Sequence, residues 1–164
     1  MSDLLTEIYR SHRQGLFSVA LAITGSRQQA EDAVQEAFCK LVDRKPLTGD
    51  AVPYVFKTVR NSAIDIHRRE QRDRTLSESL FNGYIPRAKP TDPQSELLSA
   101  ERDQILRQAI DNLSDNEKEA IVLKALAGLT FQQAGEVAGI PAKTIATRYR
   151  RALETLETRL RGDT

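Results

Sequence analysis

A short run near the C-terminus combines basic and hydroxyl side chains at a spacing suited to binding nucleic acid. Between Lys143 and Arg151 the sequence has four basic residues and no acidic one. On a helix, such groups can bond to phosphates and to base edges in a major groove. The candidate contact residues are Lys143, Thr144, Thr147, Arg148, Arg150 and Arg151. An ordinary solvated helix fits the same pattern, so this run alone does not establish DNA binding.

The residues around this run predict a helix–turn–helix. Thr130 and Gln133 have the spacing of a capping box, and Gly139 suits the left-handed residue that ends a helix. Pro141 then stands at the start of a second helix, where its missing N–H costs little. The apolar residues of that second helix share the side opposite its basic and hydroxyl groups. They are Ile145, Tyr149, Ala152, Leu153, Leu156 and Leu160.

A second polar stripe lies on a helix expected from Pro53 to about Arg69. Its members recur at helical spacing: Tyr54, Thr58, Asn61, Asp65, Arg68 and Arg72. An aromatic ring can stack on an unpaired base, arginines can hold phosphates, and amide or carboxylate groups can bond to base edges. A solvated amphipathic surface explains the stripe equally well. In that reading Asp65 pairs with Arg68 or Arg69.

Composition favours helices and argues against several classes of function. The chain has 164 residues, no Trp and a formal net charge of +1, so nucleic-acid binding would depend on local charge. Cys39 is the only cysteine, which excludes an internal disulfide and a multi-cysteine metal site. We interpret Cys39 as a tolerated small residue, and we expect His12 and His67 to be surface residues without metal or catalytic roles.

No group of residues predicts catalysis. The sequence has no metal-ligand cluster, no nucleophile with a base and no phosphate-binding glycine loop, so we expect no enzyme activity and no cofactor. It also has no signal-peptide pattern, and no apolar run approaches the ~20 residues of a spanning helix. We therefore expect a cytoplasmic protein that does not insert into membranes.

Apolar spacing predicts an all-α chain of two small helical domains, residues 1–70 and 94–164, with the helix–turn–helix in the second. The linker between them, residues 71–93, loses the helical period and contains three prolines. In the second domain, a helix with apolar positions at Ile105 and Leu106 precedes one that Ser114 caps.

Three helices are expected in the first domain. The first carries Leu4 in its apolar period and ends at Gly25, and Ser26 can cap the second. Apolar positions of the second helix point inward: Ala30, Ala33, Val34, Ala37, Phe38, Leu41 and Val42. Its other side is acidic and amide-rich, with Glu31, Asp32, Gln35 and Glu36.

Three segments resemble, in the expected order, the extracytoplasmic-function sigma factors, a two-domain group of the sigma-70 family of bacterial RNA polymerase. The segment AEDAVQEAF, residues 30–38, is similar to the family's core-binding segment AEDxxQExF. YVFKTVRNSAIDIHRR, residues 54–69, resembles its −10 segment. GIP followed by TIATR, residues 139–148, is similar to the start of its −35 recognition helix.

The resemblance implies a set of contacts and partners. Residues 1–70 would bind core RNA polymerase and the −10 element, and residues 94–164 the −35 element. The implied core-binding residues are Glu31, Asp32, Gln35, Glu36 and Phe38. The implied −10 residues are Tyr54, Arg60, Asn61, Asp65, Arg68 and Arg69. Core RNA polymerase and promoter DNA are the implied partners, and an anti-sigma factor is a further candidate.

The chain departs from the family pattern at three positions. Tyr54 stands where Trp is usual, Gly135 replaces a common Ala, and Lys143 replaces a Gly before the recognition threonine. These changes affect which promoter sequence the protein would recognise. They do not alter the class of protein that the resemblance implies. Two alternatives remain, an autonomous helix–turn–helix regulator and a helical adaptor that binds partners but not DNA. Only the adaptor would show no salt-dependent affinity for DNA.

Overall fold

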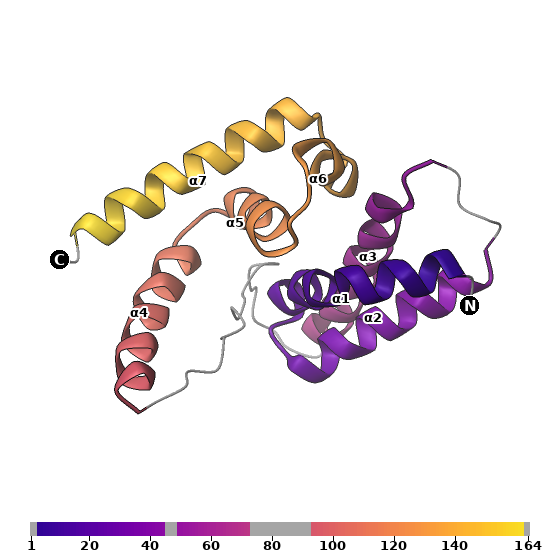
Figure 1. Cartoon of the computed structure of the whole chain (residues 1–164), viewed down its shortest axis with the longest axis horizontal. Coiled ribbons are helices and arrows are strands. Elements are labelled where there is room, and N and C mark those ends of the chain that lie inside the picture. The colour runs from indigo at the N-terminus through magenta and orange to yellow at the C-terminus, as the bar shows by residue number, and fades with distance from the viewer. Residues whose placement is uncertain (1–2, 45–48, 73–92, 163–164) are drawn as a thin grey trace.

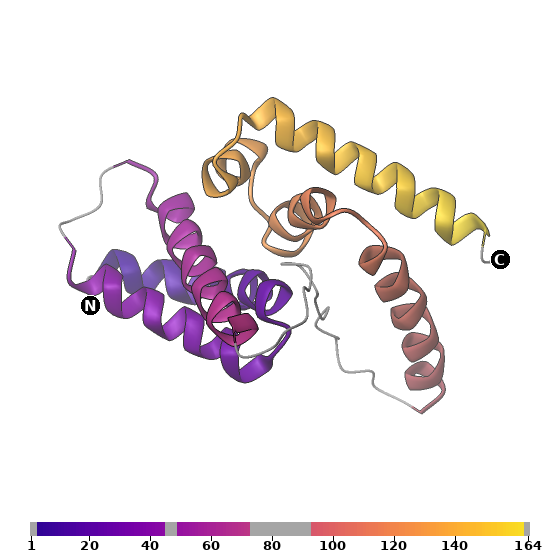
Figure 2. The same ribbon diagram turned by 180° about the vertical axis from the view of Figure 1, so that it is seen from behind.

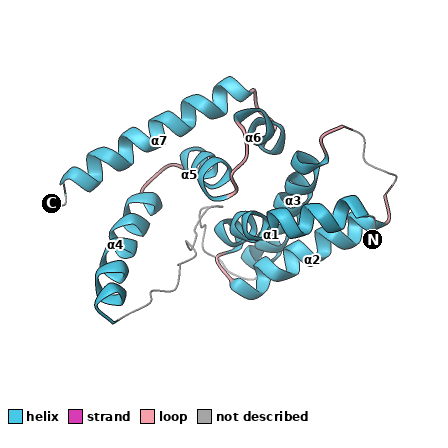
Figure 3. Ribbon diagram, viewed as in Figure 1, coloured by secondary structure: helices cyan, strands magenta, loops and turns pink. Residues whose placement is uncertain are grey.

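The computed structural model describes residues 3–44, 49–72 and 93–162. Within these ranges the chain is helical and has no strand, so the expected all-α class is confirmed (Figure 3). The elements in order are α1 (Asp3–Thr24), α2 (Arg27–Val42), α3 (Ala51–Arg72), α4 (Pro93–Asp111), α5 (Asp115–Ile121), the π-helical segment η1 (Val122–Leu126), α6 (Phe131–Ala138) and α7 (Ala142–Gly162). Helices α1–α3 form one bundle, and α4–α7 form an arch beside it that approaches the bundle through α6 (Figures 1 and 2).

The ends of α1 and α2 lie where the sequence predicts them. Gly25 has a φ of 69° and follows α1, and the Ser26 hydroxyl accepts a hydrogen bond from the Gln29 backbone N–H at 3.3 Å. The Gln29 side chain does not return to Ser26. It donates to the Glu70 carboxylate at 2.5 Å and thereby ties the start of α2 to the end of α3.

Helix α3 is longer than expected at both ends. It begins at Ala51, so Pro53 lies within the first turn, where the missing N–H leaves no hydrogen bond unmade. It continues to Arg72, so the first two residues of the predicted linker are helical. Residues 73–92, which make up most of that linker, lie outside the described residues.

The bundle of α1–α3 has a well-packed apolar interior. Its side chains include Leu16 and Phe56, which are fully buried, and the Tyr9 ring meets the Phe38 ring edge-on with 5.3 Å between centroids. Two residues expected inside are instead exposed, Leu4 at 43% and Val42 at 47%. They lie at the outer ends of α1 and α2, where the described part of the chain does not cover them.

The helical stretch after Ser114 changes character before it ends. The Ser114 hydroxyl accepts from the Glu117 backbone N–H at 3.3 Å, as predicted for the cap of α5. The last turn is π-helical, because the Ala127 N–H donates to the Val122 carbonyl at 2.8 Å. Such a turn is uncommon in proteins and often lies at functional sites, and here the Ala127 backbone that follows it lies against Gly15 of α1.

One apolar core crosses from the bundle into the C-terminal half. The buried cluster that contains Leu16 and Phe56 continues into Leu123, Leu129 and Val137. A smaller cluster joins α4, α5 and α7. The two halves expected from the sequence are therefore in contact in this structure, through α1 with η1 and α3 with α6.

Candidate nucleic-acid and polymerase interfaces

The turn between α6 and α7 is built as the sequence predicts, with one addition. The Thr130 hydroxyl accepts from the Gln133 N–H and the Gln133 side chain accepts from the Thr130 N–H, both at 3.0 Å, which completes the capping box. Gly139 is left-handed with a φ of 75°. The N–H groups of Gly139 and Ile140 both donate to the Gly135 carbonyl, at 2.8 and 3.0 Å, and close the turn.

The structure explains why residue 135 is a glycine, which could not be inferred from the sequence. A Cβ at this position would lie 2.7 Å from the Ile140 carbonyl oxygen and 3.1 Å from the Ala142 nitrogen. The first of these separations is shorter than real side chains show, and both contacts are with backbone. Gly135 therefore lets the turn fold tightly against α6, which sets the direction in which α7 leaves.

Helix α7 presents the predicted basic stripe outward. Ile145, Ala152 and Leu156 are buried, and the ring of Tyr149 packs edge-on against Phe131 with centroids 5.7 Å apart. The six candidate contact residues are exposed or half-buried: Lys143, Thr144, Thr147, Arg148, Arg150 and Arg151. Among the described residues, none of the four cations has an acidic partner. The stripe is thus free to meet phosphate and base edges.

The buried apolar side of α7 is narrower than the sequence predicts. Leu153 is 44% exposed and Leu160 is also exposed, although both were expected in the core. On α4, Ile105 and Leu106 are exposed as well. The described helices cover only part of the apolar side of α4 and only part of that of α7.

On α3 most of the predicted stripe faces solvent. Asn61, Asp65 and Arg68 are exposed, and Tyr54 is half-buried. The Tyr54 hydroxyl accepts a hydrogen bond from Arg44, whose guanidinium carbon lies 5.7 Å from the centre of the tyrosine ring. Sequence reasoning did not single out Arg44, although a basic residue in the loop before α3 was a signal for it. Arg44 adds a cation beside the candidate stacking ring.

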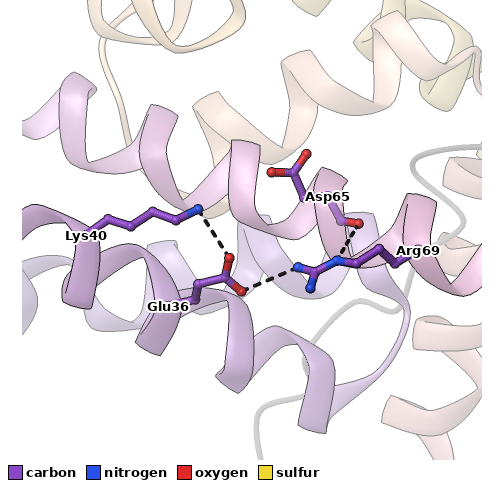
Figure 4. A network of polar contacts seen from close by, with 4 residues as sticks. All are labelled: Glu36, Lys40, Asp65 and Arg69. Atoms are coloured by element: carbon purple, nitrogen blue, oxygen red, sulfur yellow. Dashed lines mark hydrogen bonds and ion pairs between the residues drawn. The ribbon is translucent and has the colours of Figure 1, made fainter.

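Asp65 does not form the ion pair with Arg68 or Arg69 that a solvated surface would allow. Its carboxylate points away from Arg69, and the Arg69 Nε–H donates to the backbone oxygen of Asp65 at 3.3 Å (Figure 4). The Arg69 guanidinium instead lies 3.6 Å from Glu36. The Asp65 carboxylate is therefore available for a base.

Arg60, an implied −10 residue that is not part of the stripe, contacts the C-terminal half. Its Nε donates to the Glu119 carboxylate of α5 at 2.5 Å. The Glu119 side chain is only 8% exposed and that of Arg60 is 21% exposed. In this structure Arg60 is thus engaged by a carboxylate, although the resemblance places it on promoter DNA.

The acidic side of α2 is exposed as predicted. Glu31, Asp32 and Gln35 face solvent. Glu36 is half-buried and lies between Lys40, at 3.2 Å, and Arg69 (Figure 4).

Phe38, which the resemblance assigns to polymerase binding, is 8% exposed and packs on Tyr9. It lies in the core beneath the acidic surface, where it can support that surface but not present its ring to a partner.

The two histidines pack against the bundle, whereas the cysteine lies on the exposed side of α2. His67 was expected at the surface but is 4% exposed, because α3 turns this position toward the bundle. His12 packs edge-on against Phe56, with 5.6 Å between ring centroids. Cys39 is exposed. The described part of the chain contains no cluster of residues that could hold a metal ion, and none of its helices is long and apolar enough to span a membrane.

Both halves of the chain match models of one protein family. Residues 8–73 match sigma-70 region 2, and residues 103–156 match sigma-70 region 4. The first model covers the acidic side of α2 and the stripe of α3. The second covers the helix–turn–helix.

Two curated relatives are similar along most of their length. The chain is 26% identical to the ECF RNA polymerase sigma factor SigM of Bacillus subtilis, over 94% of this chain and 96% of SigM. It is 28% identical to the ECF RNA polymerase sigma-E factor of Haemophilus influenzae, over 96% of this chain and 86% of that protein.

A solved structure shares the fold. The sigma factor RpoE of Bartonella quintana, solved in complex with the anti-sigma factor NepR, superposes with a TM-score of 0.71 at 21% identity, covering 99% of this chain and 100% of RpoE. Three findings point to the same family. The two family models match in the expected order, two relatives align over most of their length, and a solved sigma factor shares the helical fold. The chain belongs to the sigma-70 family of RNA polymerase sigma factors, in its extracytoplasmic-function (ECF) group.

Proposed function

We propose that this sigma factor brings core RNA polymerase to promoters through three surfaces. The acidic side of α2, with Glu31, Asp32 and Gln35, meets polymerase. The stripe of α3 holds the melted −10 strand, and the basic stripe of α7 enters the major groove of the −35 duplex. The protein would act in the cytoplasm, where polymerase and chromosome are.

The observation that carries this proposal is the pair of outward-facing stripes on α3 and α7. The α3 stripe pairs an aromatic ring with amide, carboxylate and guanidinium groups, which suits unpaired bases. The α7 stripe lies on the second helix of the helix–turn–helix. It has four cations that no described acidic residue neutralises. An autonomous regulator would not need a surface for single-stranded DNA.

Phosphodiester chemistry would belong to the polymerase. The sigma factor would contribute binding and positioning alone. An anti-sigma factor is a further partner that we propose, since RpoE of Bartonella quintana was solved in complex with one.

Run-off transcription with purified core polymerase on genomic fragments tests the proposal. We expect discrete transcripts that require both the polymerase and this chain. Asp32→Arg should lower polymerase affinity in a pull-down titration, because it reverses a charge on the proposed contact surface. Glu101→Arg makes the same charge change at an exposed site on α4 and serves as the control. Tight duplex binding without polymerase, and no polymerase-dependent transcript, would favour the autonomous regulator instead.

A further inference from the structure

Two threonines stand on the basic stripe of α7, and their hydroxyl groups differ in hydrogen bonding. Thr144 and Thr147 are both half-buried and lie one turn apart. The Thr147 hydroxyl oxygen lies 3.0 Å from the carbonyl oxygen of Lys143. Among the described residues, the Thr144 hydroxyl has no comparable partner. The two side chains are therefore of one type but are not equivalent toward a ligand.

The direction of the Thr147 hydrogen bond follows from its partner. A carbonyl oxygen carries no hydrogen, so the Thr147 hydroxyl donates its single proton to Lys143. Its oxygen is then left with lone pairs alone to offer. Threonine in a helix often makes this bond to the carbonyl four residues earlier, and the bond selects one of its two common rotamers. Toward DNA, Thr147 is thus an acceptor and not a donor.

The residues around Thr147 suit close approach of this part of α7 to the bases. Lys143 lies one turn before it and Arg151 one turn after it, and neither cation has an acidic partner among the described residues. Phosphate contacts fix the register of a recognition helix, and side chains near its N-terminal end touch base edges. The two long cationic side chains can reach phosphates, while the short Thr147 side chain between them is left for a base edge.

The four bases fall into two classes when they face such an acceptor. In the major groove adenine and cytosine present an exocyclic amine, which donates, whereas guanine and thymine present the keto acceptors O6 and O4. A hydroxyl that rotates freely accepts from an amine or donates to a keto oxygen, so it binds both classes. A hydroxyl whose proton is already bonded can accept from an amine but has nothing to donate to a keto oxygen.

We propose that Thr147 selects adenine or cytosine over guanine or thymine at one position of the −35 element, because the Lys143 carbonyl holds its proton. The proposal rests on the function proposed above and adds the class of base that one residue recognises. To bind a keto base, Thr147 must break its bond within the helix. One such bond changes an equilibrium constant by about three- to tenfold, which is the discrimination expected. Thr144, whose proton is free, should not distinguish the two classes.

The chain contains a matched control for this hydrogen bond. Thr158 donates to the Glu154 carbonyl at 2.9 Å, which is the same bond to the residue four positions earlier. It lies three turns beyond Thr147 on the same side of α7, about 16 Å away at about 1.5 Å per residue. Glu154 and Glu157 flank it, and their carboxylates oppose the approach of phosphates. Thr158 therefore has the bond of Thr147 without its access to DNA.

Promoter selection measures the discrimination. Holoenzyme assembled from core polymerase and the full-length chain selects bound promoters from a library randomised across the −35 element. At one position the wild type should enrich adenine and cytosine together by about three- to tenfold over guanine and thymine. Thr147→Val keeps the branched shape without the hydroxyl and should abolish this enrichment. Thr158→Val makes the same change at the control site and should select as the wild type does.

Base analogues test the contact from the side of the DNA. At the position identified, purine replaces adenine, or 2-pyrimidinone replaces cytosine, and each analogue lacks the exocyclic amine. Binding of the wild-type holoenzyme should weaken by about three- to tenfold. With Thr147→Val the analogue should have no further effect, because the partner of the amine is already absent. If circular dichroism shows that the valine variant loses helix, Thr147→Ala replaces it, since alanine is the better helix former.

Three results would overturn the proposal. Enrichment of guanine or thymine that depends on Thr147 would mean that its hydroxyl donates to the base. Selection unchanged in both Thr147→Val and Thr147→Ala would mean that this residue recognises no base. An analogue that weakens the wild type and Thr147→Val equally would assign the amine to another residue. Failure of the proposed function differs from all three, since even the wild-type holoenzyme would then select no promoter.

Discussion

Gln133 binds Asp50 with the same side chain that closes the cap of its own helix. Its oxygen accepts from the Thr130 N–H at 3.0 Å while its nitrogen donates to Asp50 at 2.9 Å. One amide thus stabilises α6 and links α6 to α3. The two roles can be separated by substitution, because only the oxygen is needed for the cap.

Gln133→Ala removes both roles, and we expect it to lower the free energy of unfolding by roughly 1 kcal/mol, the usual value of a capping interaction. Gln133→Glu keeps a capping oxygen and loses only the link to Asp50. Urea denaturation of both variants measures the difference. Equal destabilisation by alanine and glutamate would show that the cap contributes nothing.

Gly135→Ala should destabilise the helix–turn–helix although alanine is the better helix former. The new Cβ would lie 2.7 Å from a backbone oxygen, and such overpacking costs typically 1–3 kcal/mol, against a gain of about 1 kcal/mol in propensity. Thermal unfolding shows whether the melting temperature of Gly135→Ala falls, as expected, or rises. Gly162→Ala is the control, because nothing lies within 4 Å of a Cβ at that position. An unchanged melting temperature for Gly135→Ala would contradict the close approach.

Tyr54 variants distinguish stacking from the contact with Arg44. Tyr54→Phe keeps the ring but removes the hydroxyl that Arg44 reaches, so promoter melting should be close to normal. Tyr54→Ala removes a stack worth roughly 1–3 kcal/mol and should reduce open complexes accordingly. Permanganate footprinting of the −10 region measures promoter melting with each variant. Normal melting in Tyr54→Ala would remove this residue from strand capture.

The α7 stripe should divide into base-reading and phosphate-binding residues. Arg148→Ala and Arg151→Ala are expected to relax preference at a particular base pair, by about 1–3 kcal/mol of discrimination. Lys143→Ala should lower the salt slope by ~1 and leave sequence preference intact. Selection from a randomised −35 library measures each effect. Small effects that do not depend on sequence in all three variants would mean that the stripe is only a solvated surface.

Local signals predicted much of this fold. Ser26, Ser114 and Thr130 all cap the helices they were expected to cap, and Gly139 is left-handed as expected. These features depend on residues a few positions apart, so the sequence alone specifies them. The outward stripes of α3 and α7 follow from helical periodicity in the same way.

Features that depend on distant neighbours were not predictable. Periodicity gives the direction of a side chain but not whether another helix covers it, which is why Val42 and Leu153 are exposed and His67 is buried. The partner of Arg60 lies 59 residues away. Gly135 looked like a loss of helix propensity, because the carbonyl that excludes a side chain belongs to the following turn.

The apolar core that runs from α1–α3 into η1 and α6 has a consequence for cooperativity. Elements that share one core gain most of their stability together, so the bundle and the helix–turn–helix should melt in a single calorimetric transition while they are packed. A chain of 164 residues should thus unfold as one cooperative unit while its two halves share this core.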